Sequence, residues 1–236
     1  MSESSPSLEE TMALHVMRRQ CGIAYRKHGT WYVGTGSVVE LGGGKYILTC
    51  KHVADSFFNS ERTQVLFEQG GELSKEDLEY VSYVDDPIDQ AALGVPSSFD
   101  IEHSFEESDF DAVSDFSNYD FRGNGLFVYG YPIERVERTE EGFLFPRFGF
   151  LTELDEYSES RLVLSYLKGT DQVVTKSGLD IPDPGGMSGG LILTVPNFES
   201  DKIWTPTNAR ALAMQYAWNT KDCLYASSLQ HILDSL

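Results

Sequence analysis

Between residues 21 and 216 the sequence is a succession of short apolar runs separated by glycines and other turn residues. The early runs are Cys21–Tyr25, Trp31–Val39, Lys45–Cys50, Gln64–Phe67 and Leu78–Val84. The later runs are Gly125–Gly130, Gly142–Phe145, Arg161–Tyr166, Gln172–Thr175, Leu191–Val195 and Ala211–Tyr216. Short strands bounded by turn signals, without alternating helical segments, predict an all-β fold built as barrels or a sandwich.

Helical patterns occur only near the two ends of the chain. Ser7 and Glu10 fit a capping box ahead of an apolar stripe, which predicts a helix over residues 8–19. This helix either docks on the main body or forms a solvated arm, and the sequence leaves both readings open. Ser228 is placed to cap a last helix, whose apolar residues are Leu229, Ile232, Leu233 and Leu236.

Charge and cysteine content restrict the class of protein. The chain has 236 residues and a formal net charge of −19, which argues against nucleic-acid or anionic-membrane binding. The polar start of the sequence lacks the pattern of a secretory signal, and no run approaches the length of a membrane span. Three cysteines, Cys21, Cys50 and Cys223, without such a signal indicate reduced thiols and a cytoplasmic location.

Residues 72–115 are strongly acidic, and Lys75 is the only lysine or arginine among them. A solvated surface loop is the favoured interpretation of such a stretch. A cation site is the alternative, but the spacing of a calcium loop, with alternating oxygen ligands around a central glycine, is absent.

The stretch Gly185-Gly186-Met187-Ser188-Gly189-Gly190 carries the clearest chemical signal. Glycines let the backbone turn sharply and approach other groups closely. Successive N–H groups in such a turn form an anion-binding concavity. A serine beside them combines a nucleophile with donors for a developing oxyanion, which is what acyl transfer requires.

A serine nucleophile needs a base, and His52 is the best candidate. It follows the predicted strand that ends at Cys50, with Lys51 between them, so it is held rigidly at a strand exit. The other four histidines are interpreted as surface or packing residues: His15, His28, His103 and His231.

Together these segments resemble the trypsin-like, chymotrypsin-fold serine peptidases, and most closely their bacterial, disulfide-free branches. The stretch Leu48–Val53 matches the family's histidine motif, and Gly186–Gly190 matches its serine motif. Phe127–Pro132 is similar to the strand and turn that often open the second barrel. The resemblance covers roughly residues 21–236.

The family also requires a carboxylate that orients the histidine, between His52 and Ser188 at the start of a strand. Asp111 and Asp109 both fit in position, and neither fits the usual spacing of Asp, apolar, small, apolar. Asp111 is preferred, because Asp109 as the acid would place a second carboxylate directly behind the triad, where burial is costly.

The resemblance implies two six-stranded antiparallel β-barrels with the active site between them, plus short terminal helices. The expected parts are an arm over residues 1–20, a first barrel over 21–118 and a second barrel with the last helix over 119–236. The acidic loop, residues 72–110, belongs to the first barrel.

It also implies a serine endopeptidase with His52, Asp111 and Ser188 as triad. The backbone N–H groups of Gly186 and Ser188 form the oxyanion hole. The substrate is a protein or peptide, and neither a cofactor nor a metal is expected. Met187 replaces the aspartate that secreted members pair with a newly cut amino terminus. That replacement argues against activation by clipping and leaves a regulatory protein partner as an expectation.

The walls of the specificity pocket are expected at Ser177–Gly185 and around Ala213–Trp218. Asp180 and Asp183 lie in the first of these segments, where a carboxylate would favour a basic substrate side chain. Because aspartate beside proline is ordinary turn chemistry, both are interpreted as exposed loop residues.

Three other functions are compatible with parts of the sequence. An esterase elbow shares the Gly-X-Ser-X-Gly pattern, but it links a strand to a helix and its histidine follows the serine. A catalytically silent peptidase-like binding module stays open because the acid is uncertain. Zinc hydrolysis is weak, because the histidines and cysteines lack metal-ligand spacing.

Overall fold

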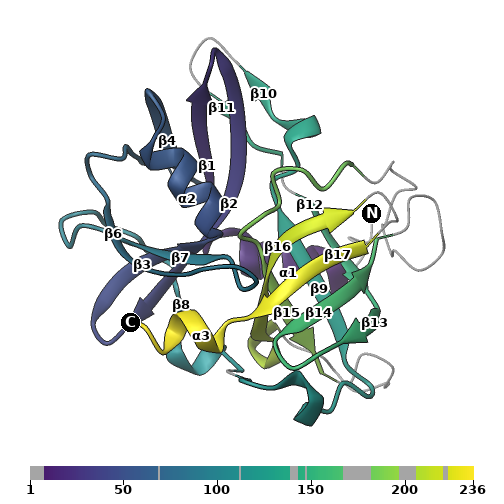
Figure 1. The fold of residues 1–236 in the computed structure, drawn as a ribbon. Coiled ribbons are helices and arrows are strands. Elements are labelled where there is room, and N and C mark those ends of the chain that lie inside the picture. The colour runs from purple at the N-terminus through teal and green to yellow at the C-terminus, as the bar shows by residue number, and fades with distance from the viewer. Residues whose placement is uncertain are drawn as a thin grey trace, which may run out of the picture.

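The computed structural model describes residues 8–68, 70–111, 113–138, 143–146, 148–166, 182–196, 206–219 and 223–236. Figure 1 shows two β-sheets and a few short helices. The α-helices are α1 (Leu8–Met17), α2 (Lys51–Phe58) and α3 (Gln230–Leu233). The short 3₁₀ turns are η1 (Glu107–Asp109), η2 (Phe116–Asn118), η3 (Ile133–Arg135) and η4 (Pro206–Asn208).

The first sheet has eight strands, in the order β5-β4-β1-β2-β3-β7-β6 with β8 beside β2. Its strands are β1 (Gln20–Lys27), β2 (Thr30–Leu41), β3 (Gly44–Thr49), β4 (Arg62–Phe67), β5 (Glu72–Leu73), β6 (Glu79–Val84), β7 (Gln90–Gly94) and β8 (Phe105–Glu106). Neighbours are antiparallel, except that β8 runs parallel to β2. His28 and Gly29 form the tight β1–β2 turn, both with positive φ.

The second sheet has seven antiparallel strands, in the order β12-β9-β15-β16-β17-β14-β13. Its strands are β9 (Gly125–Gly130), β12 (Phe148–Thr152), β13 (Leu154–Tyr157), β14 (Arg161–Ser165), β15 (Leu191–Val195), β16 (Arg210–Asn219) and β17 (Cys223–Ser228). A separate hairpin joins β10 (Glu137–Arg138) and β11 (Phe143–Leu144).

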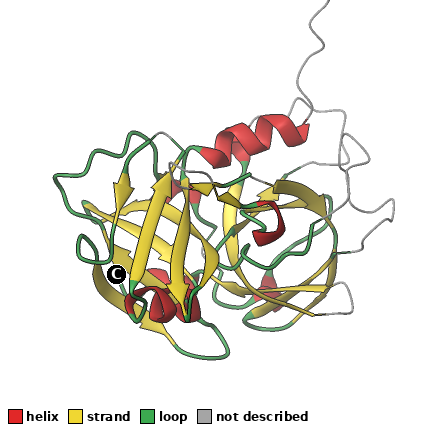
Figure 2. Ribbon diagram, turned by 90° about the horizontal axis from the view of Figure 1, so that it is seen from above, coloured by secondary structure: helices red, strands yellow, loops and turns green. Residues whose placement is uncertain are grey.

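The two curled sheets lie side by side (Figure 2). This arrangement confirms the expected all-β, two-barrel fold of chymotrypsin type, although the sheets of the described chain have eight and seven strands instead of six each. The expected boundary between residues 118 and 119 lies in the segment that connects β8 to β9. One apolar cluster includes side chains from both sheets, and a second fills the interior of the second sheet.

The amino-terminal helix is docked rather than solvated. Met12 and Val16, four residues apart on one face of α1, are both fully buried in the first apolar cluster. Just beyond the helix, Arg19 forms an ion pair with Asp109 at 3.6 Å. The helix ends at Met17 rather than Arg19, and its expected cap, Ser7, lies outside the described residues.

The acidic segment is more ordered than a solvated loop. It contains β6, and β7 crosses the interior of the first sheet with Ala91, Ala92 and Leu93 fully buried. No prediction covered α2, β5, β7, β8, β10, β12, β13 or β17. The strand expected at Gln172–Thr175 lies outside the described residues.

The state of the cysteines and the length of the helices bear on two expectations from the sequence. All three cysteines are free, and Cys21 and Cys50 are buried. Within the described ranges, every helix is too short or too polar to cross a membrane.

Candidate active site

His52 is paired with Asp89. Its imidazole Nδ1 lies 2.5 Å from Asp89 Oδ2, and its backbone N–H donates to Asp89 Oδ1 at 3.0 Å. The Asp89 side chain is only 11% exposed, whereas that of His52 is 48% exposed. The buried carboxylate therefore fixes the ring orientation and requires the proton on Nδ1, which leaves Nε2 as the basic nitrogen.

The Asp89 backbone is held from both adjacent elements. Lys51, the first residue of α2, donates its N–H to the carbonyl of Asp89 at 3.2 Å. The preceding carbonyl, that of Ile88, accepts from Ser227 Oγ at 2.7 Å. Asp89 adopts φ of 54°, a left-handed conformation that aspartate tolerates better than most residues. These contacts position the carboxylate before any ligand arrives.

The structure does not bring Asp111 or Asp109 to His52; the carboxylate beside His52 is that of Asp89. Asp111 donates its backbone N–H to Ala211 O at 2.9 Å, and its carboxylate hydrogen-bonds the Tyr119 side chain. The carboxylate of Asp109 caps its own 3₁₀ turn at the N–H of Glu106 and pairs with Arg19. Both carboxylates therefore have structural partners elsewhere.

Asp89 was missed because the residue after it is polar. The family spacing expects an apolar residue there, and the sequence has Gln90. Gln90 is nonetheless fully buried, and its amide donates to Ser227 Oγ at 2.9 Å and to Ser228 O at 2.8 Å. Partners on the second sheet accept from the amide nitrogen, although the buried Oε1 has no hydrogen-bond partner in the described chain. A sequence pattern does not reveal such contacts. The apolar run Ala91-Ala92-Leu93 just beyond Gln90 could have indicated a strand that starts after Asp89.

The serine turn depends on its glycines. Gly186 and Gly189 have φ of +94° and +97°, which side chains rarely adopt. A Cβ on Gly186 would lie 2.6 Å from Tyr131 O, and one on Gly189 would lie 2.6 Å from Thr49 Oγ1. Met187 between them is fully buried in the apolar cluster of the second sheet. Close packing on both sides thus fixes the turn.

The peptide planes around Ser188 direct two N–H groups to the same turn. Gly185 O accepts from Ile133 N at 2.6 Å, and Met187 O accepts from Gly190 N at 2.9 Å. In a planar trans peptide the N–H points opposite to the C=O of the preceding residue. The N–H groups of Gly186 and Ser188 therefore point away from Ile133 N and Gly190 N. Neither of these two N–H groups has an acceptor within the described chain.

Thr35 of β2 connects the first sheet to this turn. Its hydroxyl accepts from Tyr131 N at 3.1 Å and donates to Gly186 O at 3.0 Å. Its backbone N–H donates to Ser188 O at 2.9 Å, while its carbonyl accepts from Thr49 Oγ1 at 2.8 Å. Thr35 is fully buried, so these bonds are shielded from water. One residue therefore links the serine turn to the strand that leads to His52.

A single carbonyl brings the histidine and serine segments together. Gln215 O accepts from Gly189 N at 2.8 Å and from Cys50 Sγ at 3.3 Å. Gly189 follows Ser188 directly, and Cys50 stands two residues before His52. The structure thus unites at one site the two motifs that lie far apart in the sequence.

The hydroxyl of Ser188 is half-buried. It donates to Tyr216 O at 3.4 Å, a long hydrogen bond. Within the described residues this carbonyl is its acceptor. Weak hydrogen bonds of catalytic hydroxyls are common in unliganded sites and tighten when substrate binds.

Cys50, His52 and Asp89 place potential metal-ligand atoms within 4.8 Å of one another. Their chemistry does not suit a metal ion. Burial raises the pKa of the Cys50 thiol well above its usual range, and that thiol is a donor to Gln215 O. Since Nδ1 of His52 is already bonded to Asp89, the cluster fits a catalytic pair better than a ligand set.

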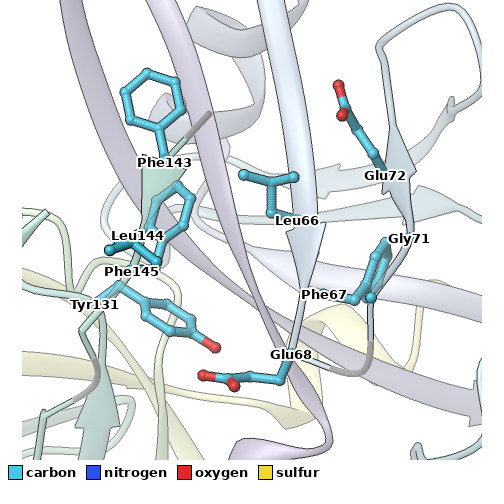
Figure 3. Close-up of a pocket in the computed structure, with 10 residues that line it drawn as sticks. Leu66, Phe67, Glu68, Gly71, Glu72, Tyr131, Phe143, Leu144 and Phe145 are labelled. Atoms are coloured by element: carbon cyan, nitrogen blue, oxygen red, sulfur yellow. The ribbon is translucent and has the colours of Figure 1, made fainter. Parts of the chain in front are cut away.

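A groove of about 460 Å³ opens between β4, β5 and the β10–β11 hairpin. Figure 3 shows aromatic side chains around it and the Tyr131 hydroxyl pointing toward the Glu68 carboxylate. Its lining residues include Leu66, Phe67, Phe143, Leu144 and Phe145. Because Tyr131 also contacts Gly186 and Thr35, the groove adjoins one side of the serine turn.

The expected specificity walls are partly described. Residues 177–181, including Asp180, lie outside the described residues. Asp183 Oδ1 accepts from Gly185 N at 2.9 Å, so this carboxylate supports the serine turn. That contact agrees with turn chemistry rather than recognition of a basic side chain.

The fold and the site together define the class: a chymotrypsin-type two-barrel protein of the serine peptidase fold. The fold also excludes an esterase elbow, because the strand β15 follows Ser188 and His52 precedes it.

Similar solved structures are proteases with this fold. They include the active form of the Rv3671c protease from M. tuberculosis, at 16% identity and a TM-score of 0.57, covering 100% of this chain and 87% of that one. A serine endoprotease from Yersinia pestis has 14% identity and a TM-score of 0.57, covering 98% and 66%. Tobacco etch virus protease with product has 13% identity and a TM-score of 0.52, covering 97% and 78%.

Sequence comparison adds no closer relative. No family profile matches the sequence, and no curated protein matches it significantly. At such identities the likeness establishes the fold, and the chemistry rests on the site.

Proposed function

We propose that this protein is a serine endopeptidase with Ser188 as nucleophile, His52 as general base and Asp89 as the orienting acid. The observation that carries the proposal is the two-point hold of Asp89 on His52, at a site that Gln215 O joins to the serine turn. Asp89 replaces Asp111 in the triad that the sequence led us to expect.

In the proposed reaction, Nε2 of His52 removes the proton from the Ser188 hydroxyl as its oxygen attacks the peptide carbonyl carbon. The N–H groups of Gly186 and Ser188 stabilise the oxyanion that forms. The protonated His52 then gives its proton to the leaving amine, and the C–N bond breaks. Water, deprotonated by the same nitrogen, hydrolyses the acyl-enzyme and restores the serine.

Attack requires a change at the serine side chain. Its hydrogen bond to Tyr216 O must give way to one with Nε2 of His52, by rotation about the Cα–Cβ bond. The existing bond is long, so its loss costs little. We propose that substrate binding favours this rotation.

The second sheet offers an edge for the substrate backbone. β15 pairs with β16 only as far as Met214, whereas β17 continues to pair with β16 as far as Asn219. In the described part of the chain, residues 216–219 therefore have one unpaired edge beside Ser188. An extended peptide can add there as an antiparallel strand. We propose that the residues before the scissile bond bind this edge and those after it approach the aromatic groove of Figure 3.

Regulation and location are also proposals. Met187, an apolar anchor, fixes the serine turn without a charged partner, which supports activity independent of a newly cut amino terminus. Because Met187 cannot pair with a cut amino terminus, we also propose that any regulation comes from a partner protein. Three free cysteines, two of them buried, support a reducing, cytoplasm-like compartment.

Cleavage profiling with a peptide library tests this function. The wild type should hydrolyse a subset of peptides, and Ser188→Ala, which removes only the hydroxyl, should abolish cleavage without unfolding the protein. Hydrolysis retained by Ser188→Ala would overturn the assignment. A folded wild type that cleaves no peptide would favour the silent binding module instead.

A further inference from the structure

Three side chains form a row on one face of the second sheet. Arg161 begins β14, Tyr225 lies in the adjacent strand β17, and Tyr216 lies in β16 beyond it. The guanidinium carbon of Arg161 lies 5.7 Å from the centroid of the Tyr225 ring. The rings of Tyr225 and Tyr216 have centroids 6.5 Å apart. The arginine thus extends across β17 toward β16.

Tyr216 connects this row to the proposed catalytic residues. Its carbonyl accepts the Ser188 hydroxyl, and its ring packs against the apolar cluster that includes residues of the first sheet. Burial raises the pKa of the Tyr216 phenol, the positive charge and hydrogen bond of Arg161 lower it, and the Asp89 charge raises it. One phenol therefore lies within electrostatic reach of both Asp89 and Arg161.

Arg161 is exposed and carries an unpaired charge. Among the described residues it forms no ion pair, in contrast to Arg19 with Asp109 and Arg122 with Asp120. This is notable in a chain with 37 acidic and 18 basic residues. The guanidinium lies over the Tyr225 ring and hydrogen-bonds the Tyr216 phenol. A guanidinium has five N–H donors, so others are left for a carboxylate, which its planar fork matches.

We propose that Arg161 is a specificity-determining residue that binds an acidic side chain of the substrate, two to four residues before the scissile bond. This inference rests on the proposed peptidase function. A peptide strand on the free edge of residues 216–219 runs beside Tyr216, so side chains on one of its faces point toward the row. An aspartate or glutamate there meets the Arg161 guanidinium, which has no carboxylate partner among the described residues.

The test uses pairs of peptides that differ only by glutamate or glutamine at each of these three positions. At one position glutamate should raise kcat/KM by about two- to fivefold, as expected of an exposed ion pair. Arg161→Gln should remove this preference, and Arg161→Glu should reverse it in favour of lysine. Higher salt should reduce the preference in the wild type.

Arg122→Ala is the matched control, because it removes a guanidinium that is already paired with Asp120. It should keep the preference. Equal cleavage of each glutamate and glutamine pair by the wild type would overturn the inference while leaving the peptidase function intact. So would an equal loss toward all peptides in Arg161→Gln. Absence of any cleavage by the folded wild type would overturn the peptidase function, and the inference with it.

Discussion

Asp89 bonds His52 twice, at the backbone N–H and at the imidazole Nδ1, and it does so from a loop end that is itself anchored to the second sheet. The carboxylate is nearly buried, while the imidazole is about half exposed. This geometry selects one tautomer and presents Nε2 to the site.

Asp89→Asn should lower kcat by on the order of 10⁴-fold, because an amide favours the wrong imidazole tautomer and cannot stabilise imidazolium. Asp111→Asn is the matched control and should leave kcat within about twofold, since Asp111 contacts Tyr119 rather than His52. Steady-state hydrolysis of one peptide measures both. The reverse ranking of the two variants would return the triad acid to Asp111.

Thr35→Val should lower kcat with little change in KM. The variant keeps the side-chain shape but leaves Tyr131 N and Gly186 O without their partner, at a cost of about 1–3 kcal/mol for each buried group. Thr35→Ser retains the hydroxyl and should retain most of the activity. If the valine and serine variants had equal kcat, the hydroxyl would not position the serine turn.

Gly189→Ala should destabilise the protein by more than about 2 kcal/mol, because a Cβ there collides with the Thr35 carbonyl and with Thr49 Oγ1. Gly29→Ala is the matched control. It has a similar positive φ of +82° but nothing within 4 Å of the new Cβ, so it reports backbone strain alone. Urea unfolding measures both, and equal losses would contradict the packing argument.

The docked α1 should make stability depend on pH. Burial, reinforced by the Arg19 charge and opposed by Asp109, lowers the pKa of His15 from 6.5 to about 4. The unfolded chain therefore binds the proton more readily than the folded chain between these values. The free energy of unfolding loses this contribution progressively as pH falls from about 6.5 to 4.

His15→Gln provides the comparison, because glutamine retains an acceptor for Arg19 and does not titrate. Urea unfolding at pH 7 and pH 5 should show a smaller loss of stability on acidification in the variant than in the wild type. Equal losses in the two proteins would show that His15 does not contribute.

Much of the fold could be predicted from local patterns. Alternating and continuous apolar runs with glycine turns predict β1, β2, β3, β9 and β15, because their side chains pack on one or both faces of a sheet. The helix α2 was not predicted, because its eight residues are too few to show a helical repeat of apolar positions. Only Val53, Ala54 and Phe57 are buried. Its length and packing depend on the sheet it covers.

The candidate site was predictable only in part. The serine and histidine motifs are local, so their residues could be identified from neighbours in sequence. The partner of His52 depends on tertiary structure: Asp89 precedes a strand whose first residue, Gln90, is polar and becomes acceptable only through contacts with Ser227 and Ser228. Because Gln90 breaks the expected spacing after Asp89, the sequence pattern indicated Asp111 and Asp109 instead.

The most direct measurement is covalent labelling by a fluorophosphonate, followed by intact-mass and peptide mass spectrometry. The wild type should gain a single adduct on Ser188, Ser188→Ala should gain none, and His52→Ala and Asp89→Asn should react far more slowly than Asp111→Asn. An adduct at another residue, or labelling of Ser188 at an unchanged rate in His52→Ala, would contradict a peptidase built on Ser188, His52 and Asp89.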